Sequence, residues 1–464
     1  MFLGTVDDWT AEGTVVSWYP TADTYARATE AQYHPAPVSY QQSQHLRYYR
    51  RQVSLGRDIP RLCIGAWEIS GVCDIDAMTQ ALNSHVRRHD AYHDWFALRG
   101  KDDEILRYVI DDPESIALAP TVLGEMAPLE IRKLILDTPD PLQWDCFSFG
   151  IIQGEDRFTI FIAVDHLRAD GMSAGVIFLD IQTAYFTALQ QGHVALPPAP
   201  SHREYSAKQR AHTAALDEDS PEIRRWRAFL AANNGALPKF PLELGEASAD
   251  TPGAIDVFKL IDGDQGRRFE ATCRAAGARF SGGVFACAAL AEHRLTGAAT
   301  YFGLTPFDNR RDPAHATAVG WLASFVPLAI PTAGASFAEV VSAAQASFDA
   351  NTSLGAVPYY HLLERADGSW GRLEVPDRPV PMLSYIDIRK LPFGDYFDGL
   401  RAGIWGDNRL SETVCMWVNR MHDGTQLVAA YPGTEVARGS VLRYVETMRA
   451  EFTRVADAGL HVDA

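Results

Sequence analysis

The sequence predicts an α/β (α+β) protein built as two lobes, and three observations support this prediction. The chain has 464 residues, whereas a single hydrophobic core usually stops growing at roughly 250–300 residues. In both halves, short apolar runs rich in β-branched and aromatic residues alternate with longer segments of helical periodicity. A stretch rich in proline and polar residues, "QQGHVALPPAPSHREYS", separates the halves. We therefore expect an N-terminal lobe over residues 1–205 and a C-terminal lobe over residues 206–464.

The N-terminal lobe is expected to alternate strands and helices along the chain. Asp74 suits the N-cap of a helix with apolar residues at helical spacing. The run "RFTIFIAVDH" is short and apolar, which is typical of a buried strand. A turn follows at Asp170–Gly171, and a helix is expected to begin near Ser173. The predicted elements are strands over 61–70, 104–110 and 157–166 and helices over 73–96 and 173–189.

The C-terminal lobe repeats this alternation. Ser220 and Pro221 suit the N-cap and first residue of a helix. Gly277 suits the end of another helix. The predicted strands are 300–306, 380–388, 413–419 and 426–432, and the predicted helices include 264–277, 281–297 and 440–456.

Composition excludes several classes of protein. Acidic residues outnumber basic ones by 59 to 42, for a formal net charge of -17, so we do not expect a nucleic-acid partner. The six cysteines show no C-x-x-C spacing and are expected to be reduced, mostly buried thiols. The sequence shows neither a signal peptide nor an obvious membrane span. The expected location is the cytoplasm, with the inner face of the plasma membrane as a further expectation.

The stretch "VDHLRADGMSAG" places a histidine, an aspartate and a glycine at the end of an expected buried strand. Unperturbed histidine titrates nearest pH 7 among the side chains, which suits a general base. A lone histidine is more often a hydrogen-bonded residue of the core, but the Asp170–Gly171 pair moves the interpretation of His166 towards catalysis. Gly171 is expected at a backbone position that a β-carbon would strain.

Asp170 has two interpretations. It could accept a proton or bind a metal, or it could be a structural anion that pairs with an arginine. We favour the second, because a buried carboxylate needs such a partner, and "TPFDNRRDP" supplies Arg310 and Arg311. A metal site that joins Asp165, His166 and Asp170 is disfavoured, since adjacent strand residues point to opposite faces. We expect no metal.

These motifs together resemble a known family. The spacing H-x-x-x-D-G after a strand resembles the core motif of the CoA-dependent acyltransferase superfamily, which includes chloramphenicol acetyltransferase and the condensation domains of peptide synthetases. "GAWEISGVCDIDAMTQALNSHVRRHDAYHDWF" and "DNRRD…VGWLASFVPL" resemble the opening and a later motif of condensation domains. "PVSYQQSQHLRYYR", "TPDPLQWDCFSFGIIQ" and "TYFGLTPFDNRRDP" are similar to the polyketide-associated (Pap) acyltransferases that acylate trehalose in mycobacteria.

The resemblance implies two chloramphenicol-acetyltransferase-like lobes with a tunnel between them. His166 would act there as the general base on an acceptor hydroxyl, which attacks an acyl thioester without a covalent intermediate. Asp170 would pair with Arg310. Either the Gly171 N–H or the Ser324 hydroxyl would bind the oxyanion, and the sequence does not decide between them. Trp321 is a further candidate for this oxyanion and tunnel region.

Two details of the motif differ from the family or stay open. Many relatives carry two histidines, whereas here Asp165 precedes His166; the second histidine is the catalytic one in the family. Arg168, inside the motif, is expected to be a solvated surface arginine, with a contact to a CoA phosphate as the alternative.

The resemblance also implies the substrates and partners. Acyl-CoA, or a carrier-bound thioester, would be the co-substrate, a trehalose-type sugar the acceptor, and no cofactor would be bound. One alternative is an acyltransferase that uses a lipid diol or a fatty alcohol. Another is a non-catalytic condensation-like scaffold that docks a partner. Peripheral contact with a membrane, a lipid transporter or a polyketide synthase is a further expectation.

Overall fold

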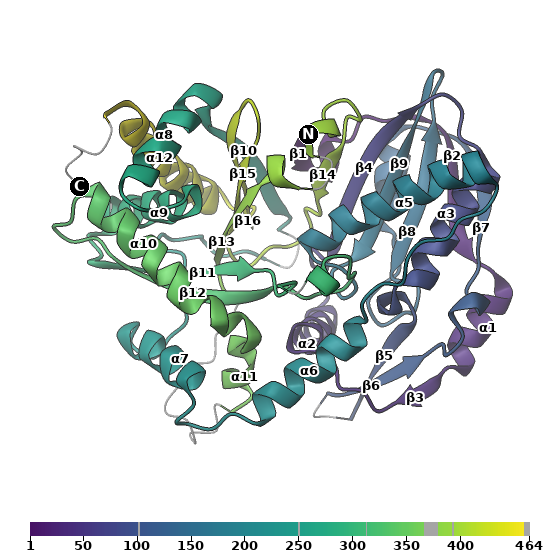
Figure 1. Cartoon of the computed structure of the whole chain (residues 1–464), viewed down its shortest axis with the longest axis horizontal. Helices are drawn as coiled ribbons and strands as arrows, with labels where there is room; N and C mark the ends of the chain where they lie inside the picture. The colour runs from purple at the N-terminus through teal and green to yellow at the C-terminus, as the bar shows by residue number, and fades with distance from the viewer. Residues whose placement is uncertain (101–102, 249–250, 312, 366–378, 392–393, 459–464) are drawn as a thin grey trace. The chain divides into compact units, whose positions relative to one another are not determined.

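The computed structural model describes residues 1–100, 103–248, 251–311, 313–365, 379–391 and 394–458 (Figure 1). The chain divides into two compact units. Unit 1 comprises Met1–Ala211, Arg310–Leu322 and Pro392–Asp407, and unit 2 comprises His212–Asn309, Ala323–Leu391 and Asn408–Ala464. This division differs from the contiguous lobes 1–205 and 206–464, because two segments from the second half of the chain belong to unit 1. One adds a strand to its sheet, and the other brings Arg310 to Asp170.

Among the described residues, unit 1 contains a seven-stranded sheet in the order β1-β14-β4-β9-β8-β2-β7. The pair β1–β14 is parallel and the other neighbours are antiparallel. Its strands are β1 (Phe2–Thr5), β2 (Gly13–Pro20), β4 (Leu62–Ser70), β7 (Leu118–Met126), β8 (Phe147–Gln153), β9 (Arg157–Asp165) and β14 (Gly403–Gly406). A small sheet joins β3 (Gln32–His34), β6 (Glu104–Val109) and β5 (Asp94–Arg99).

Helices α3 (Ile75–Arg88) and α5 (Gly171–Gln191) pack on each other and on strands of the large sheet, and α5 crosses its middle strands in Figure 1. The unit also contains α1 (Ala22–Glu30), α2 (Tyr40–Ser54), α4 (Pro128–Leu136) and the start of α6 (His202–Ala214). The Asp74 side chain caps α3 as predicted. The helix is shorter than the predicted 73–96, because a 3-10 turn at Asp90–Tyr92 and then β5 follow it.

The connection from β9 to α5 positions the candidate site. The predicted strand over 157–166 is confirmed as β9, which is central in the sheet and almost wholly buried. Helix α5 begins at Gly171, two residues before the predicted start, because Asp170 is its N-cap and accepts a hydrogen bond from the Ser173 N–H. By length and composition α5 could cross a membrane. Half of it is buried in this protein, where it packs against α3.

Unit 2 has its own core. Its four-stranded sheet runs β10-β16-β15-β13, with β13 parallel to β15, and β11 and β12 form a separate antiparallel pair. Helices α8, α9 and α12 pack on one another over a large apolar cluster. The strands are β10 (Gly253–Asp262), β11 (Thr300–Phe307), β12 (Ser324–Pro331), β13 (Met382–Asp387), β15 (Cys415–Arg420) and β16 (Gly424–Pro432). The helices are α7 (Pro221–Ala232), α8 (Gly263–Ala275), α9 (Phe280–Thr296), α10 (Phe337–Asn351), α11 (Tyr359–Leu363) and α12 (Glu435–Ala458).

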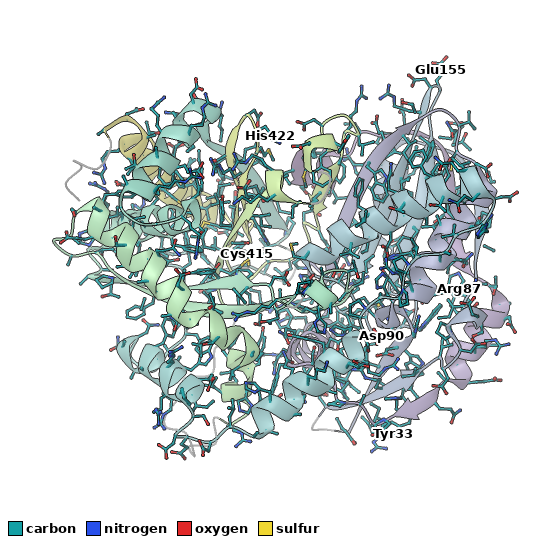
Figure 2. The ribbon with its side chains drawn as sticks, in the orientation of Figure 1. Tyr33, Arg87, Asp90, Glu155, Cys415 and His422 are labelled. Atoms are coloured by element: carbon teal, nitrogen blue, oxygen red, sulfur yellow. The ribbon has the colours of Figure 1, made fainter. Side chains whose placement is uncertain are left out.

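The cysteines are unpaired, as predicted. All six side chains are free thiols, and four of them are buried. Burial raises the pKa of Cys415, labelled on β15 in Figure 2, to about 12. Burial also raises the pKa of the other five thiols, so all six remain protonated near neutral pH and behave as small apolar side chains.

Candidate active site

Asp170 is the most heavily hydrogen-bonded carboxylate of the candidate site. Arg310 donates from two nitrogens, 2.9 Å to each carboxylate oxygen, and both side chains are almost fully buried. The Ser173 hydroxyl and N–H donate to Oδ1 at 2.9 and 3.0 Å. The Leu322 N–H donates to Oδ2 at 3.0 Å. This is the ion pair that the sequence predicts, and its oxygens are occupied by donors rather than open to a substrate proton.

Ser173 extends this network to the segment that carries Trp321. Its hydroxyl lies 2.9 Å from the Gly320 carbonyl and 3.2 Å from the Gly320 N–H. Arg310 also donates to the Gly320 carbonyl at 3.2 Å. The sequence interpretation placed Ser173 at the start of a helix but did not assign it to the site. The spacing D-x-x-S is the signal that would have indicated it, because an aspartate at the N-cap accepts from the N–H three residues later.

His166 directly follows β9, and its ring packs against Trp321 with 3.9 Å between the ring centroids. Its Nδ1 is buried and has no hydrogen-bond partner among the described residues. The residue as a whole keeps partial exposure. Burial, together with nearby His45, lowers the pKa of His166 below its ordinary value of 6.5, against the opposite effect of Asp170. The imidazole is therefore neutral near pH 7 and able to accept a proton.

Asp165, which occupies the place of the first histidine of the family motif, points away into a second polar network. His45 of α2 donates from Nε2 to its Oδ1 at 2.8 Å, and Arg61 donates to its Oδ2 at 2.9 Å. Burial alone would raise the pKa of Asp165, but His45 and Arg61 lower it below its ordinary value. His45 lies 120 residues before Asp165, so no local pattern could have indicated this contact.

Gly171 does not occupy a strained backbone position, and this sequence prediction is wrong. It is the first residue of α5, and a β-carbon placed there would meet no atom within 4 Å. Its φ lies outside the left-handed region that favours glycine. As the first residue of the helix, Gly171 presents an N–H that lacks an intrahelical acceptor. Gly171 therefore leaves open space and a backbone hydrogen-bond donor at the first position of α5.

Replacing Gly171 by alanine should therefore leave the fold intact. We expect a free energy of unfolding that is unchanged or raised by up to about 1 kcal/mol, because alanine is the better helix former. Urea unfolding measures this change. Gly175→Ala is the matched control, since a β-carbon there also meets no atom within 4 Å. A loss of more than about 1 kcal/mol in Gly171→Ala alone would contradict the assignment.

Ser324 lies in unit 2 at the start of β12. Its hydroxyl is buried and donates to the Gly355 carbonyl at 2.5 Å. The Asn309 side-chain amide donates to the same hydroxyl at 3.0 Å. The hydroxyl hydrogen is thus committed to a backbone carbonyl. To bind an oxyanion, Ser324 would first have to release that bond.

Arg168 is not the solvated surface arginine that the sequence suggested. Its side chain is almost fully buried and donates to the carbonyls of Ala91 and Trp144. Its Nε lies 2.9 Å from the Cys146 sulfur. These bonds tie the turn after β9 to the segments that carry Ala91, Trp144 and Cys146. The Arg168 guanidinium is committed inside unit 1 and does not support the alternative of a CoA phosphate contact.

Two groups of side chains have the composition of a metal site. His85 of α3, His89 directly after that helix and Asp180 of α5 bring three ligand atoms within 4.8 Å of one another. Both histidines donate to Asp180, which Arg88 already neutralises. A dication would add uncompensated charge to this buried cluster.

The second group is the motif itself. Its two carboxylates, Asp165 and Asp170, are each paired with an arginine. The residues of both groups therefore fit structural ion-pair networks better than metal ligation.

Comparison with known proteins agrees with this fold. Residues 65–369 match the family model described as "Condensation domain". Acyltransferase PapA3 of Mycobacterium tuberculosis is 40% identical over 464 residues, covering 98% of this chain and 97% of that protein. Trehalose-2-sulfate acyltransferase PapA2 of Mycobacterium bovis is 41% identical, covering 99% and 98%. A solved structure titled "PapA2 acyl transferase" matches with a TM-score of 0.93 at 40% identity, covering 99% of this chain and 100% of that one.

A model match over most of the chain, on a fold of this kind, means that the chain belongs to the condensation-domain family. The similarity to PapA3 and PapA2 over nearly the full length narrows the assignment within that family: the protein is a polyketide-associated (Pap) acyltransferase. The predicted family, fold class and enzyme class are thereby confirmed. The tunnel expected between the lobes stays a prediction.

Proposed function

We propose that this Pap acyltransferase moves a long-chain acyl group from acyl-CoA, or from a carrier-bound thioester, to a hydroxyl of trehalose or of a trehalose glycolipid. The acceptor is supported by the relative named trehalose-2-sulfate acyltransferase, at 41% identity. The observation that carries the reaction type is His166. It is a neutral imidazole with partial exposure and one enclosed nitrogen, placed directly after a rigid central strand.

His166 acts as the general base in this proposal. Because Nδ1 is enclosed, Nε2 takes the proton from the acceptor hydroxyl. The hydroxyl oxygen then attacks the thioester carbonyl carbon, a C–O bond forms and the C–S bond breaks. The leaving thiolate takes the proton back from His166 and departs as the CoA thiol. Acyl-CoA is consumed as a co-substrate, and no further cofactor is needed.

The tetrahedral oxyanion needs a hydrogen-bond donor, and of the two candidates the Gly171 N–H is favoured. It lies in the first turn of α5, where the helix dipole also stabilises negative charge. The Ser324 hydroxyl already donates to Gly355. Removing one oxyanion donor typically costs about 10²–10³-fold in kcat. Because the Gly171 donor is a backbone N–H, no side-chain substitution removes it.

The lowered pKa of His166 gives a pH dependence with a definite sign. The base works only when it is neutral, and its folded pKa lies below 6.5 because the ring is buried and because the charge of nearby His45 opposes its protonation. We therefore expect the acid limb of kcat/KM to fall off below pH 6.5, with full activity at pH 7. A kcat/KM profile measured between about pH 4.5 and 8 tests this. An acid limb centred above pH 6.5 would contradict it.

A donor and acceptor screen with the purified protein tests the proposed function. Palmitoyl-CoA as donor, with trehalose and trehalose-2-sulfate as acceptors, should give an acyl sugar detectable by mass spectrometry. Ester formed only on a fatty alcohol or a lipid diol would overturn the sugar acceptor. Transfer to no acceptor, together with unchanged cellular lipids in a His166→Ala strain, would instead support the scaffold alternative.

A further inference from the structure

The peptide groups on both sides of Trp321 are held firmly from α5. The Gly320 N–H donates to the Ser173 hydroxyl, Arg310 donates to the Gly320 carbonyl, and the Leu322 N–H donates to Asp170. Trp321 therefore stands between two fixed residues. Its indole packs against the His166 ring, with centroids 3.9 Å apart and planes 37° from parallel.

The same segment is held from α6. The His202 ring donates from Nε2 to the Trp321 carbonyl at 3.4 Å, and the Tyr205 hydroxyl donates to the Leu322 carbonyl at 3.0 Å. Gly320 has φ +150°, and a β-carbon there would lie 2.2 Å from the His202 ring. The backbone thus approaches α6 more closely than another residue type would allow.

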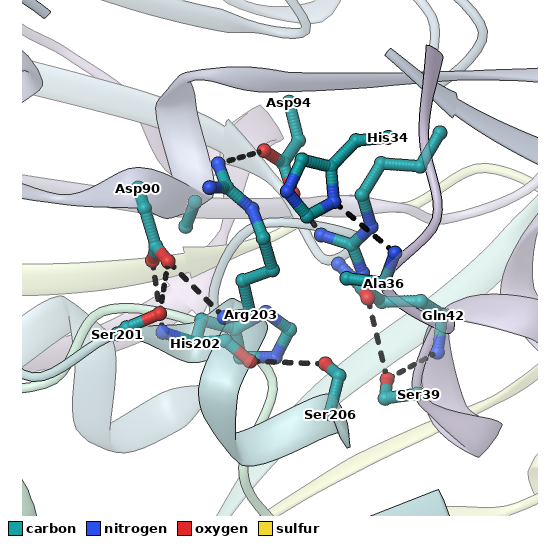
Figure 3. A network of polar contacts seen from close by, with 12 residues as sticks. His34, Ala36, Ser39, Gln42, Asp90, Asp94, Ser201, His202, Arg203 and Ser206 are labelled. Atoms are coloured by element: carbon teal, nitrogen blue, oxygen red, sulfur yellow. Dashed lines mark hydrogen bonds and ion pairs between the residues drawn. The ribbon is translucent and has the colours of Figure 1, made fainter. Parts of the chain in front are cut away.

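The start of α6 is itself anchored. Asp90, labelled in Figure 2, follows α3 and accepts from the Ser201 hydroxyl and from the backbone N–H groups of His202 and Arg203 (Figure 3). The Ser206 hydroxyl donates to the His202 carbonyl at 3.0 Å. His202 therefore has little freedom to move away from Trp321.

A second histidine contacts Trp321. The His45 ring and the indole make a T-shaped contact, with centroids 5.6 Å apart and planes 67° from parallel. Asp165 fixes that histidine through its Nε2. Trp321 thus contacts both a ring bound to Asp165 and the ring of the candidate base.

We propose that Trp321 is the positioning residue of the base: its indole, held by α5, α6 and His45, fixes the His166 ring and shields one side of it from water. The inference rests on the proposed role of His166 as the base. It goes beyond that role because it assigns the orientation of the base to a residue that does not accept the proton. A displacement of a reacting group by about 1 Å can cost about 10²-fold in rate.

Several charged groups surround this pair of rings, and a pH experiment has to separate them. Asp170 and Asp165 favour protonation of His166, whereas burial and His45 oppose it. Burial lowers the pKa of His202, which contacts the Trp321 carbonyl, to about 4. The titratable and charged groups around the two rings are His45 and His202, which contact Trp321, and the ion-paired residues Asp165, Arg61, Asp170 and Arg310.

Intrinsic fluorescence tests the contact without any substrate. An imidazolium against an indole quenches its emission, so wild type should show a pH transition that Trp321→Phe lacks. The transition should also be absent in His166→Gln and present in His45→Gln. If it persists in His166→Gln, or is absent from wild type, the assigned contact is overturned whatever the substrates of the enzyme are.

Kinetics test the positioning. We expect Trp321→Leu to lower kcat by about 10-fold to 100-fold with little change in KM, and to move the acid limb of the profile up towards pH 6.5. Trp321→Phe should recover most of kcat, because it keeps an aromatic face. Trp95→Phe is the matched control, since Trp95 stacks on Tyr108 instead. A folded Trp321→Leu variant with the wild-type kcat and profile would overturn the proposal.

Discussion

Replacing Arg310 by leucine is expected to lower the free energy of unfolding by about 3–5 kcal/mol, because it leaves the Asp170 carboxylate buried without its cation. Both side chains are at most 3% exposed, and two hydrogen bonds of 2.9 Å join them. The loss should appear in urea or thermal unfolding of the whole chain. Arg311→Leu, which changes an exposed neighbour, should stay within about 0.5 kcal/mol of wild type.

The pair can be tested further by a double-mutant cycle. Asp170→Asn alone leaves Arg310 as an uncompensated buried charge and should cost a similar amount. The double variant Asp170→Asn with Arg310→Leu should lose less than the sum of the two single losses, because neither charge then remains. Strictly additive losses would mean that the two side chains do not stabilise each other.

Replacing His166 by alanine is expected to lower the rate of acyl transfer by about 10²–10⁴-fold, the usual contribution of a general base. The loss should fall on kcat, because the imidazole acts on the proton in the transition state rather than on substrate binding. His166 is partly exposed and its Nδ1 has no partner among the described residues, so the variant should fold. Single-turnover kinetics measure the rate.

A matched substitution separates the chemistry from a general effect of losing a histidine. His193 is exposed just after α5, and His193→Ala should keep the wild-type rate. Circular dichroism should show that both variants are folded. A folded His166→Ala variant that transfers within a few-fold of wild type would mean that another group takes the proton.

The ion pair of Asp170 and Arg310 could be predicted from the sequence, because each residue lies in a recognisable sequence motif. Asp170 stands in a recognisable spacing after an apolar strand, and a buried carboxylate requires a cation. That requirement pointed to Arg310 or Arg311, and the family resemblance selected Arg310, although it lies 140 positions from Asp170. The strand before the motif, β9, could also be predicted, because its nine residues are mostly apolar, β-branched or aromatic, as is typical of a buried strand.

The parts that escaped prediction depend on tertiary packing. His45, His202 and Tyr205 reach the site from helices far away in the chain, and nothing in their neighbourhoods marks them. Arg168 was misjudged because a charged residue is exposed far more often than it is buried. Three acceptors in unit 1, the carbonyls of Ala91 and Trp144 and the Cys146 sulfur, offset the cost of burying its charge.

The start of α5 shows a third kind of error. Assigning Asp170 to a turn hid its role as the N-cap of the helix. With the helix placed two residues late, Gly171 was interpreted as a glycine required by the turn. Its ordinary backbone conformation and open surroundings show that it is the first residue of the helix.

The central claim is direct acyl transfer with His166 as the base, and one assay tests it most closely. CoA thiol release and acyl-trehalose formation would be measured together for wild type and His166→Ala, while intact mass follows the protein. We expect one thiol per ester with wild type, almost none with the variant, and no acylated protein. An acylated protein that passes its acyl group to trehalose, or equal ester from wild type and variant, would contradict the account.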